Sequence, residues 1–404
     1  MRLAAVVVAA LLAAEGAVLL MSPRSGVLEP RPIDITGYFS AAAIDRARDY
    51  RDGVLWIALA ALALKALLLI ALVARPPEWL TRVRKRPIVA GAAAGAALSL
   101  ALALVTVPLD AVAHARAVDV GLSTQDWGAW AADLLRRTAV GALMAAPVAA
   151  IAIAVVRRAP RRWWIPGSGL IVVLGALFVT AGPVVLDPLF NDFTPLRGQA
   201  RADVLQLARA AGVEVDDVQV VDASRRTTAA NAYVTGLGHT KRVVIYDTLL
   251  RRFTRAERRL VIAHELGHVR RHDVPRGLLY LLLVAPFGTL AVARLGEALA
   301  PRGARGDAAG PGTLPALVLA LALVALPMTW ISNQLSRRVE ARADTFALEL
   351  TRDPDAFIAF ERRITLQNIS NPDPPRLSQW LFGTHPTIRE RIGAGEAQKR
   401  AGGR

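Results

Sequence analysis

The chain of 404 residues is 54% hydrophobic but only 6% aromatic, and its mean hydropathy of +0.37 excludes an ordinary soluble protein. It has no cysteine, which excludes disulfides, thiolate catalysis and cysteine-ligated metals. The net charge of +16 comes from arginines that cluster beside apolar runs, so we expect the lipid bilayer, and no nucleic acid, as the partner of this charge.

The apolar residues come in runs long enough to cross a bilayer. A helix needs about 20 such residues to span the hydrocarbon core, and about seven runs meet this length. Buried helices of a soluble protein are the alternative; they could explain one or two of the runs, but not all. The sequence therefore predicts a predominantly α-helical, multi-pass integral membrane protein. The predicted spans are Leu3–Met21, Val54–Ala74, Ile88–Leu109, Ala139–Val156, Ile165–Leu186, Leu278–Ala300 and Thr313–Ile331.

Few charged residues lie within the predicted spans. Glu15 interrupts the first run, which could be a signal peptide; because a poor cleavage site follows it, we predict a retained anchor. Lys65, Arg294 and Glu297 are the other charges. Each of them either faces a polar interior or reaches the membrane interface, and the sequence leaves both interpretations open.

Two polar regions, residues 187–277 and 332–404, follow the first five spans in residues 1–186. Residues 278–331 supply two crossings between the polar regions, so both regions must lie on the same side of the membrane. We therefore expect them to build one water-facing α+β domain.

The first polar region contains both helical and strand patterns. Ala200–Ala211 has helical periodicity, and Val213–Val221 alternates as a strand does. Ala230–Thr235 and Arg242–Tyr246 are β-rich runs joined by a glycine-containing stretch, which predicts a hairpin. A helix is expected to begin at Thr254, because the tetrapeptide TRAE forms a capping box ahead of apolar positions.

The sequence AHELGHV on this predicted helix places two histidines four residues apart. His264 and His268 therefore point from one helix face toward one ion, and Glu265 is within reach of a water bound to that ion. This is the H-E-x-x-H arrangement of zinc peptidases. An exposed polar helix face is the alternative, but with six histidines in 404 residues a chance match is rare. His272, flanked by charges, is left outside the site.

A catalytic zinc site normally takes three protein ligands and a water. The second polar region opens with the helical stretch SRRVEARADTFALEL, in which Glu340 and Asp344 lie four residues apart on one face. Glu340 could complete a His₂Glu site for one zinc ion per chain, and Asp344 could orient a ligating histidine. The alternative is a surface ion pair of Glu340 with Arg337 or Arg338. The shared membrane side favours the ligand interpretation.

These motifs resemble the type I CAAX prenyl endopeptidases, a family of seven-span membrane zinc metalloproteases. The resemblance implies a zinc metalloendopeptidase with a gluzincin-like α+β domain, formed by the loop after span five and by the C-terminal tail. The matching blocks are DPLFNDFTPL (187–196), DASRRTTAANAYVTG (222–236), RVVIYDTLL (242–250), AHELGHV (263–269), SRRVEARADTFA (336–347) and THPTIRERI (384–392).

The resemblance also implies a role for each residue of the metal motif. It assigns zinc to His264, His268 and Glu340, and the general base to Glu265. Asp344 receives a supporting role beside the metal ligands.

The resemblance also implies that two further blocks contact the substrate. His385, from the His-Pro block, would stabilise the transition state near the scissile carbonyl. Asn231, Ala232 and Tyr233 would lie on a strand beside the cleft and pair with an extended substrate. Relatives often carry His-Ser where this chain has Ala229–Ala230, which affects the substrate side and not the metal motif.

The expected reaction is hydrolysis of a peptide bond in an extended or membrane-associated peptide or protein, with no obligate protein partner. A heat-shock-type membrane quality-control metalloprotease is one alternative, although such proteins usually have fewer spans. A catalytically retired membrane scaffold or transporter is another, although it has no chemical need for an intact His and Glu set. The composition, rich in Ala and Arg, suggests a bacterial cell membrane.

The membrane side of the active site has opposing signals. If the arginine-rich loops 75–87 and 157–163 are cytoplasmic, the catalytic domain lies outside. Arg46, Arg48 and Arg51 belong to the opposite set of loops, and the resemblance implies a cytosol-facing site. We therefore expect the cytoplasmic side.

Overall fold

The structure is a computed structural model that describes residues 3–78, 86–236, 241–300 and 310–402. Within these ranges, seven helices are long and apolar enough to cross a membrane, as the sequence predicts. They are α1 (Leu3–Met21), α2 (Ala41–Ala74), α4 (Pro87–Leu104), α6 (Trp127–Arg158), α7 (Trp164–Val185), α11 (Asp273–Leu299) and α12 (Leu314–Thr351).

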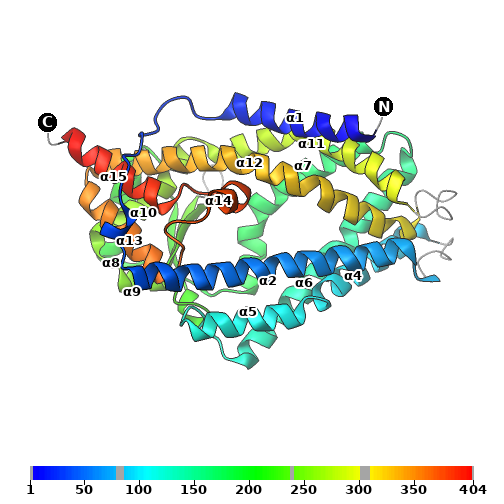
Figure 1. Ribbon diagram of the computed structural model, residues 1–404, viewed down its shortest axis with the longest axis horizontal. Helices are drawn as coiled ribbons and strands as arrows, with labels where there is room; N and C mark the ends of the chain where they lie inside the picture. The colour runs from blue at the N-terminus through cyan, green and yellow to red at the C-terminus, as the bar shows by residue number, and fades with distance from the viewer. Residues whose placement is uncertain (1–2, 79–85, 237–240, 301–309, 403–404) are drawn as a thin grey trace.

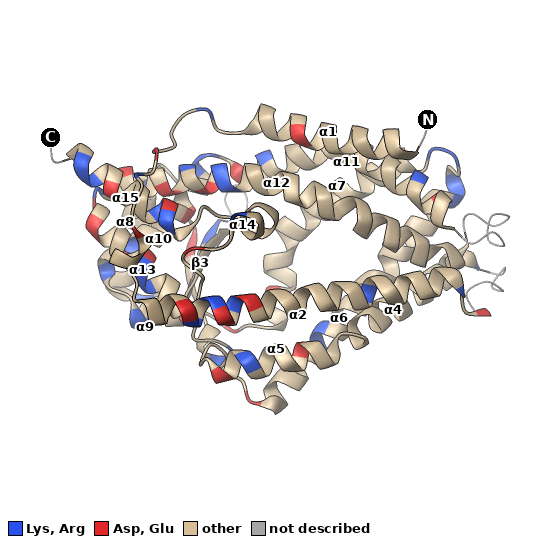
Figure 2. Ribbon diagram, viewed as in Figure 1, with Lys and Arg blue, Asp and Glu red and all other residues tan. Residues whose placement is uncertain are grey.

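Two of the long helices extend well beyond the predicted spans. The predicted span starts at Val54, whereas α2 begins at Ala41, where the Ser40 hydroxyl accepts a hydrogen bond from the Ala43 N–H and caps the helix. α12 continues without a break from its apolar half to Thr351. Both helices therefore carry polar turns out of the hydrocarbon region, and charged residues are concentrated at the end of the molecule that holds the C terminus (Figure 2).

The third predicted span, Ile88–Leu109, is wrong at its C-terminal end. α4 ends at Leu104, and the separate helix α5 (Val107–Asp119) follows after Thr106. Pro108 lies in the first turn of α5. Proline has no N–H to donate to a preceding turn, so it is tolerated at a helix start but not in the middle of a continuous span.

The charged residues of the spans have different environments. Glu15 of α1 accepts a hydrogen bond from Gln334 of α12 at 3.3 Å, so it faces a polar neighbour inside the bundle. Arg294 and Glu297 form an exposed ion pair of 3.0 Å within α11. Lys65 of α2 lines a largely apolar cavity of about 600 Å³ between the long helices.

A four-stranded sheet lies outside the long helices, with the strand order β1-β2-β4-β3. β2 and β4 are parallel, whereas β3 is antiparallel to β4 and forms an edge of the sheet. This confirms the predicted hairpin, whose turn at residues 237–240 lies outside the described residues. The predicted strand Val213–Val221 is too long, because pairing with β4 starts only at Asp217. The strands are β1 (Phe193–Pro195), β2 (Asp217–Val221), β3 (Ala232–Thr235) and β4 (Arg242–Tyr246).

Shorter helices gather around the sheet at the end of the molecule that also holds the C terminus (Figure 1). The capping box that predicts α10 is present, since the Thr254 hydroxyl and the Glu257 carboxylate each accept a hydrogen bond from the other residue's backbone. The helices are α8 (Gly198–Ala210), α9 (Asp247–Arg252), α10 (Arg255–Arg270), α13 (Pro354–Gln367), α14 (Arg376–Phe382) and α15 (Ile388–Gly402).

One apolar core joins the two polar regions. Ile245 and Leu266 from the first region and Leu348 and Phe357 from the second are fully or almost fully buried in the same cluster. Burying one such side chain contributes about 1.5–3 kcal/mol. The two segments therefore fold against each other although two membrane crossings separate them in sequence.

Candidate metal centre

The close packing of α10 against α12 builds the centre. Gly267 lies at their contact, and a Cβ atom at this position would come within 3.0 Å of the Phe346 ring. The missing side chain allows α12 to approach the helix face that carries His264 and His268. As a result, Glu340 of α12 reaches both histidines.

The donor atoms of these three residues form a triangle. The distance from His264 Nε2 to Glu340 Oε2 is 3.1 Å, and that from His264 Nε2 to His268 Nε2 is 3.2 Å. His268 Nε2 lies 3.6 Å from Glu340 Oε1. A tetrahedral zinc ion with bonds of about 2.0–2.1 Å separates its ligand atoms by about 3.4 Å. Both the donor set and its dimensions therefore fit zinc.

A carboxylate fixes the second nitrogen of each histidine. His264 Nδ1 is 2.8 Å from Asp344 Oδ1, as the helical spacing on α12 predicts. His268 Nδ1 is 3.0 Å from Asp273 Oδ2, a partner that sequence reasoning missed. Asp273 starts α11 directly after His272, whose left-handed backbone (φ 55°) turns the chain back toward α10. These contacts orient both Nε2 atoms toward the shared point.

Arginines neutralise the two supporting carboxylates. Arg391 of α15 donates to both oxygens of Asp344, at 2.9 and 2.6 Å, and Arg342 donates to Asp273 at 2.6 Å. Burial opposes protonation of His264, yet its hydrogen bonds to Asp344 and Glu340 outweigh this and raise its pKa to about 10. The carboxylates of the centre therefore favour either protonated histidines or a bound divalent cation.

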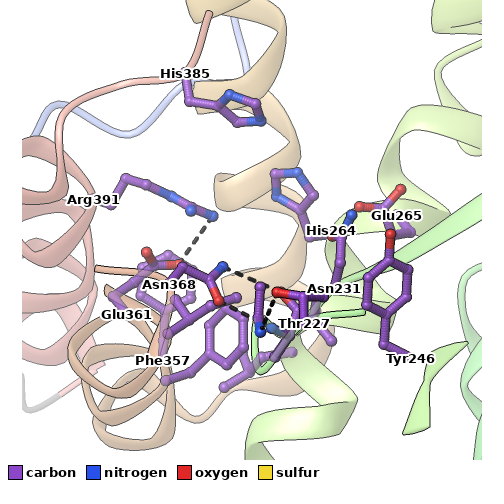
Figure 3. A pocket seen from close by; sticks show the side chains of 16 residues that line it. Thr227, Asn231, Tyr246, His264, Glu265, Phe357, Glu361, Asn368, His385 and Arg391 are labelled. Atoms are coloured by element: carbon purple, nitrogen blue, oxygen red, sulfur yellow. Dashed lines mark hydrogen bonds and ion pairs between the residues drawn. The ribbon is translucent and has the colours of Figure 1, made fainter. Parts of the chain in front are cut away.

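Glu265 lies beside the cluster on the cavity side, next to His264 (Figure 3). Burial in this low-dielectric environment raises the pKa of its carboxyl group and outweighs the opposing effects of the neighbouring His264 and His268. A carboxylate with a raised pKa is a stronger base near neutral pH.

His385 completes the rim of the cluster, with its Nε2 3.3 Å from Glu340 Oε2 and its side chain 58% exposed. The loop that carries it is held by Arg337, which donates to the carbonyl of Gly383 at 2.7 Å and contacts other carbonyls at the end of α14. The alternative partner for Arg337 suggested by the sequence, Glu340, is instead turned toward the histidines.

A cavity of about 410 Å³ extends from the cluster toward α13 (Figure 3). Of the three predicted substrate residues, Asn231 lines this cavity, whereas Ala232 is buried and Tyr233 donates from its hydroxyl to Asp187 at 3.2 Å. Apolar side chains from α10 and α13 form much of the remaining wall. These are Leu260, Val261, Phe357, Phe360 and Ile364.

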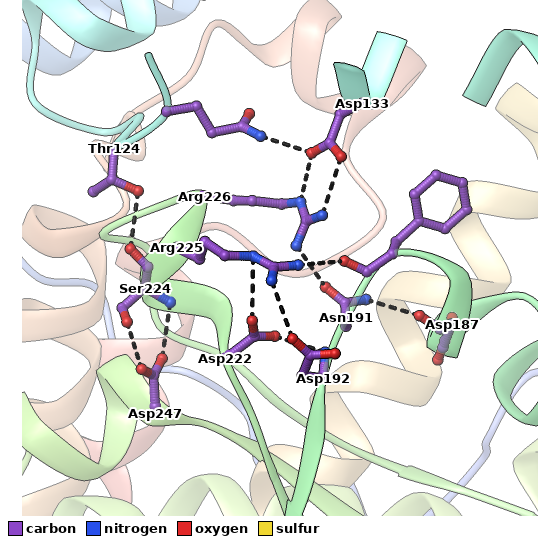
Figure 4. A network of polar contacts seen from close by, with 12 residues as sticks. Thr124, Asp133, Asp187, Asn191, Asp192, Asp222, Ser224, Arg225, Arg226 and Asp247 are labelled. Carbon is purple, nitrogen blue, oxygen red and sulfur yellow. Dashed lines mark hydrogen bonds and ion pairs between the residues drawn. The ribbon is translucent and has the colours of Figure 1, made fainter. Parts of the chain in front are cut away.

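The chain that leads into β3 is tied to membrane helix α6 through a polar network (Figure 4). Arg226 donates to both oxygens of Asp133, at 2.7 and 3.1 Å. Arg225 pairs with Asp192 and Asp222 at 3.0 and 3.3 Å. This pairing could not be predicted from a local pattern, because Asp133 and Arg226 lie far apart in the chain.

Comparison with known proteins agrees with this geometry. The family described as "Peptidase family M48" matches residues 196–398, and "CAAX prenyl protease N-terminal, five membrane helices" matches residues 27–192. The chain is 33% identical to the uncharacterized metalloprotease YhfN of Bacillus subtilis over 308 residues, which cover 73% of this chain and 71% of that protein.

Two eukaryotic comparisons extend the likeness. The chain is 29% identical over 273 residues to the probable CAAX prenyl protease 1 of Schizosaccharomyces pombe, covering 65% of this chain but only 56% of that protein. The fold is similar to that of the crystal structure of S. mikatae Ste24p, with a TM-score of 0.79, 20% identity and 98% coverage of both chains. With its membrane-spanning helices and zinc-type cluster, this chain belongs to peptidase family M48 and is a membrane zinc metallopeptidase.

Proposed function

We propose that the chain cleaves extended segments of membrane-associated peptides or proteins in the cavity beside β3, with zinc held by His264, His268 and Glu340. The observation that carries this proposal is the triangle of donor atoms, 3.1–3.6 Å on each side, with Glu265 beside it. When bound, zinc supplies a Lewis acid that polarises the scissile carbonyl and lowers the pKa of water.

The protein's own groups would carry the proton transfers. Glu265 takes a proton from the attacking water and afterwards delivers it to the leaving amine; burial, which raises its pKa, suits it to both tasks. His385 Nε2 lies 3.3 Å from Glu340 Oε2 at the rim of the cluster, where its imidazole N–H can donate to the oxygen that becomes negative in the transition state.

The edge position of β3 supports substrate binding by strand pairing. The Asn231 carbonyl accepts a hydrogen bond from the Tyr246 N–H of β4, so the backbone groups of Asn231 point toward β4. Since backbone groups alternate along a strand, the N–H and C=O of Ala232 point away from β4, toward the open edge. Ala232 would thus contribute through its backbone, and Asn231 through its side chain.

The apolar core shared by the two polar regions supports the proposed domain organisation. Residues 187–277 and 332–404 would form the proteolytic domain, whereas residues 1–186 and 278–331 would cross the membrane. We place the proteolytic domain on the cytoplasmic side. A reporter enzyme fused to the C terminus tests this orientation. Activity of a reporter that works only outside the cytoplasm would show that the proteolytic domain lies on the opposite side.

Glu265→Gln tests the function directly. The amide keeps the size of the side chain but cannot accept the proton, so peptide cleavage should fall by about 10²–10⁴, while one zinc per chain is retained. Glu349→Gln, an exposed position on α12, is the matched control and should behave as the wild type. Full cleavage by Glu265→Gln would remove it as the base. Zinc without any wild-type cleavage would favour a retired scaffold instead.

A further inference from the structure

The end of α13 contains a backbone conformation that its sequence does not favour. Ile369 has a φ of +47°, in the left-handed region that β-branched residues rarely adopt. The helix closes through a hydrogen bond from the Ser370 N–H to the Thr365 carbonyl, 2.9 Å long. Glycine is usual at the left-handed position of such helix ends, so something else must hold this turn.

Arg51, on the part of α2 that extends past the apolar segment, holds it. Its Nε donates to the Ile369 carbonyl at 2.7 Å, and its Nη2 donates to the Asn368 carbonyl at 2.6 Å. The Ile369 side chain is 7% exposed and packs in a cluster with Ala47 and Tyr50 of the same helix. The strained turn is therefore clamped by both a guanidinium and an apolar contact from α2.

The turn presents the Asn368 side chain to the substrate wall of the cavity. Its Oδ1 accepts from the Ala230 N–H at 2.9 Å, and its Nδ2 donates to the Ala230 carbonyl at 3.2 Å. One amide thus meets both backbone groups of Ala230, as a neighbouring strand would. Ala230 directly precedes Asn231, and Asn231 and Asn368 both line the cavity (Figure 3).

We propose that Asn368 is a positioning residue for substrate binding, and that Arg51 acts through it by stabilising the left-handed Ile369. The inference rests on the proposed function of the cavity. We define the substrate wall as residues 227–231. Its N-terminal end is held by α6 through the Arg226–Asp133 pair, and its C-terminal end is held by α2 through Arg51 and Asn368. The wall sets where an extended substrate pairs, whereas the metal cluster lies on other helices.

The first test compares Asn368→Ala with the wild type in the full-length protein. Loss of two hydrogen bonds to Ala230 should move the wall, so KM should rise about tenfold while kcat and zinc content change little. A merely structural loss would instead lower the amount of folded, zinc-loaded protein and leave KM unaltered. An unchanged KM in folded Asn368→Ala rejects the inference.

The second test is a double-mutant cycle between Arg51 and Ile369. Arg51→Gln should raise KM as Asn368→Ala does in the wild-type background. Ile369→Gly removes the apolar contact with α2 but lets the turn form without strain, so in that background Arg51→Gln should change KM by less than about twofold. Arg48→Gln, from an exposed pair with Asp45 on the same helix, is the control. Additive effects of the two substitutions overturn the proposal.

The same assay separates this inference from the proposed function. Wild-type cleavage that is lost in Glu265→Gln, together with an unaltered KM in Asn368→Ala, rejects only the positioning role. If the wild-type chain cleaves no peptide, both proposals fail. Binding of a fluorescent peptide substrate to Glu265→Gln, with and without Asn368→Ala, repeats the comparison without turnover, and an equal Kd in both rejects the positioning role.

Discussion

The metal cluster and the substrate wall lie on one cavity but are built differently. The cluster depends on helical spacing: His264 and His268 share one face of α10, and Glu340 enters through a single close contact between α10 and α12. The wall, residues 227–231, depends on side chains from α6, α2 and α13. The metal cluster is therefore held by two packed helices, whereas the position of the substrate wall depends on three helices. Substitutions in the cluster should change zinc binding or kcat, and substitutions that move the wall should change KM.

The largest effect in this comparison should come from the cluster's rim. Removing the imidazole with His385→Ala should lower kcat by about 10²–10³, the usual contribution of one donor to a developing oxyanion, with zinc content retained. Glu349→Ala, at an exposed position on α12 away from the cluster, is the control for side-chain removal. Steady-state kinetics decides: a normal kcat for His385→Ala would show that this histidine does not contact the reacting groups.

A smaller effect, on zinc affinity, is expected from the carboxylate that orients His268. Asp273→Asn keeps the size of the side chain but weakens its hold on His268 Nδ1, so zinc affinity should fall about 10–100-fold. Competition with a fluorescent chelator measures the affinity, and Asp355→Asn, an exposed residue that pairs with Lys399, serves as the control. Equal affinities for Asp273→Asn and the control would mean that His268 is oriented without Asp273.

Proton release should accompany zinc binding at the cluster. Hydrogen bonds to carboxylates overcome burial and raise the pKa of His264 to about 10 and that of His268 to about 9 in the metal-free protein. Below these values the imidazoles hold protons that zinc must displace, so apparent affinity should rise with pH, about tenfold per unit for each proton released. Calorimetry in two buffers of different ionisation enthalpy detects this; a release of no proton at pH 7 contradicts the proposed charge state.

The smallest effect should come from the far end of the wall. Asp133→Asn weakens the pair with Arg226, which is only partly buried, so KM should rise by less than about tenfold and kcat should stay unchanged. Asp45→Asn, from an exposed ion pair on α2, controls for loss of charge. A fall in kcat without a change in KM would show that the wall and the cluster are not independent.

This difference also explains what could be predicted from the sequence. The spacing of His264 and His268 on α10, and of Glu340 and Asp344 on α12, follows from helix geometry. The even number of predicted crossings leads to the prediction that α10 and the polar C-terminal part of α12 lie on one membrane side. The positions of these four residues in the structure agree with that reasoning.

Contacts made through irregular backbone could not be predicted. Asp273 reaches His268 only because His272 turns left-handed, and Asn368 reaches Ala230 only because Ile369 does. Nothing in a periodic pattern indicates a left-handed histidine or isoleucine. In the sequence Arg51 indicated only membrane topology, whereas in the structure it donates hydrogen bonds to the Ile369 and Asn368 carbonyls.

Zinc content of Glu340→Ala, measured by elemental analysis beside wild type and Glu265→Gln, is the decisive measurement for the three-ligand zinc centre. We expect one zinc per chain in the wild type and in Glu265→Gln, and a large loss of bound zinc in Glu340→Ala with loss of cleavage. Glu340→Ala protein that is folded and retains one zinc per chain would contradict the three-ligand centre.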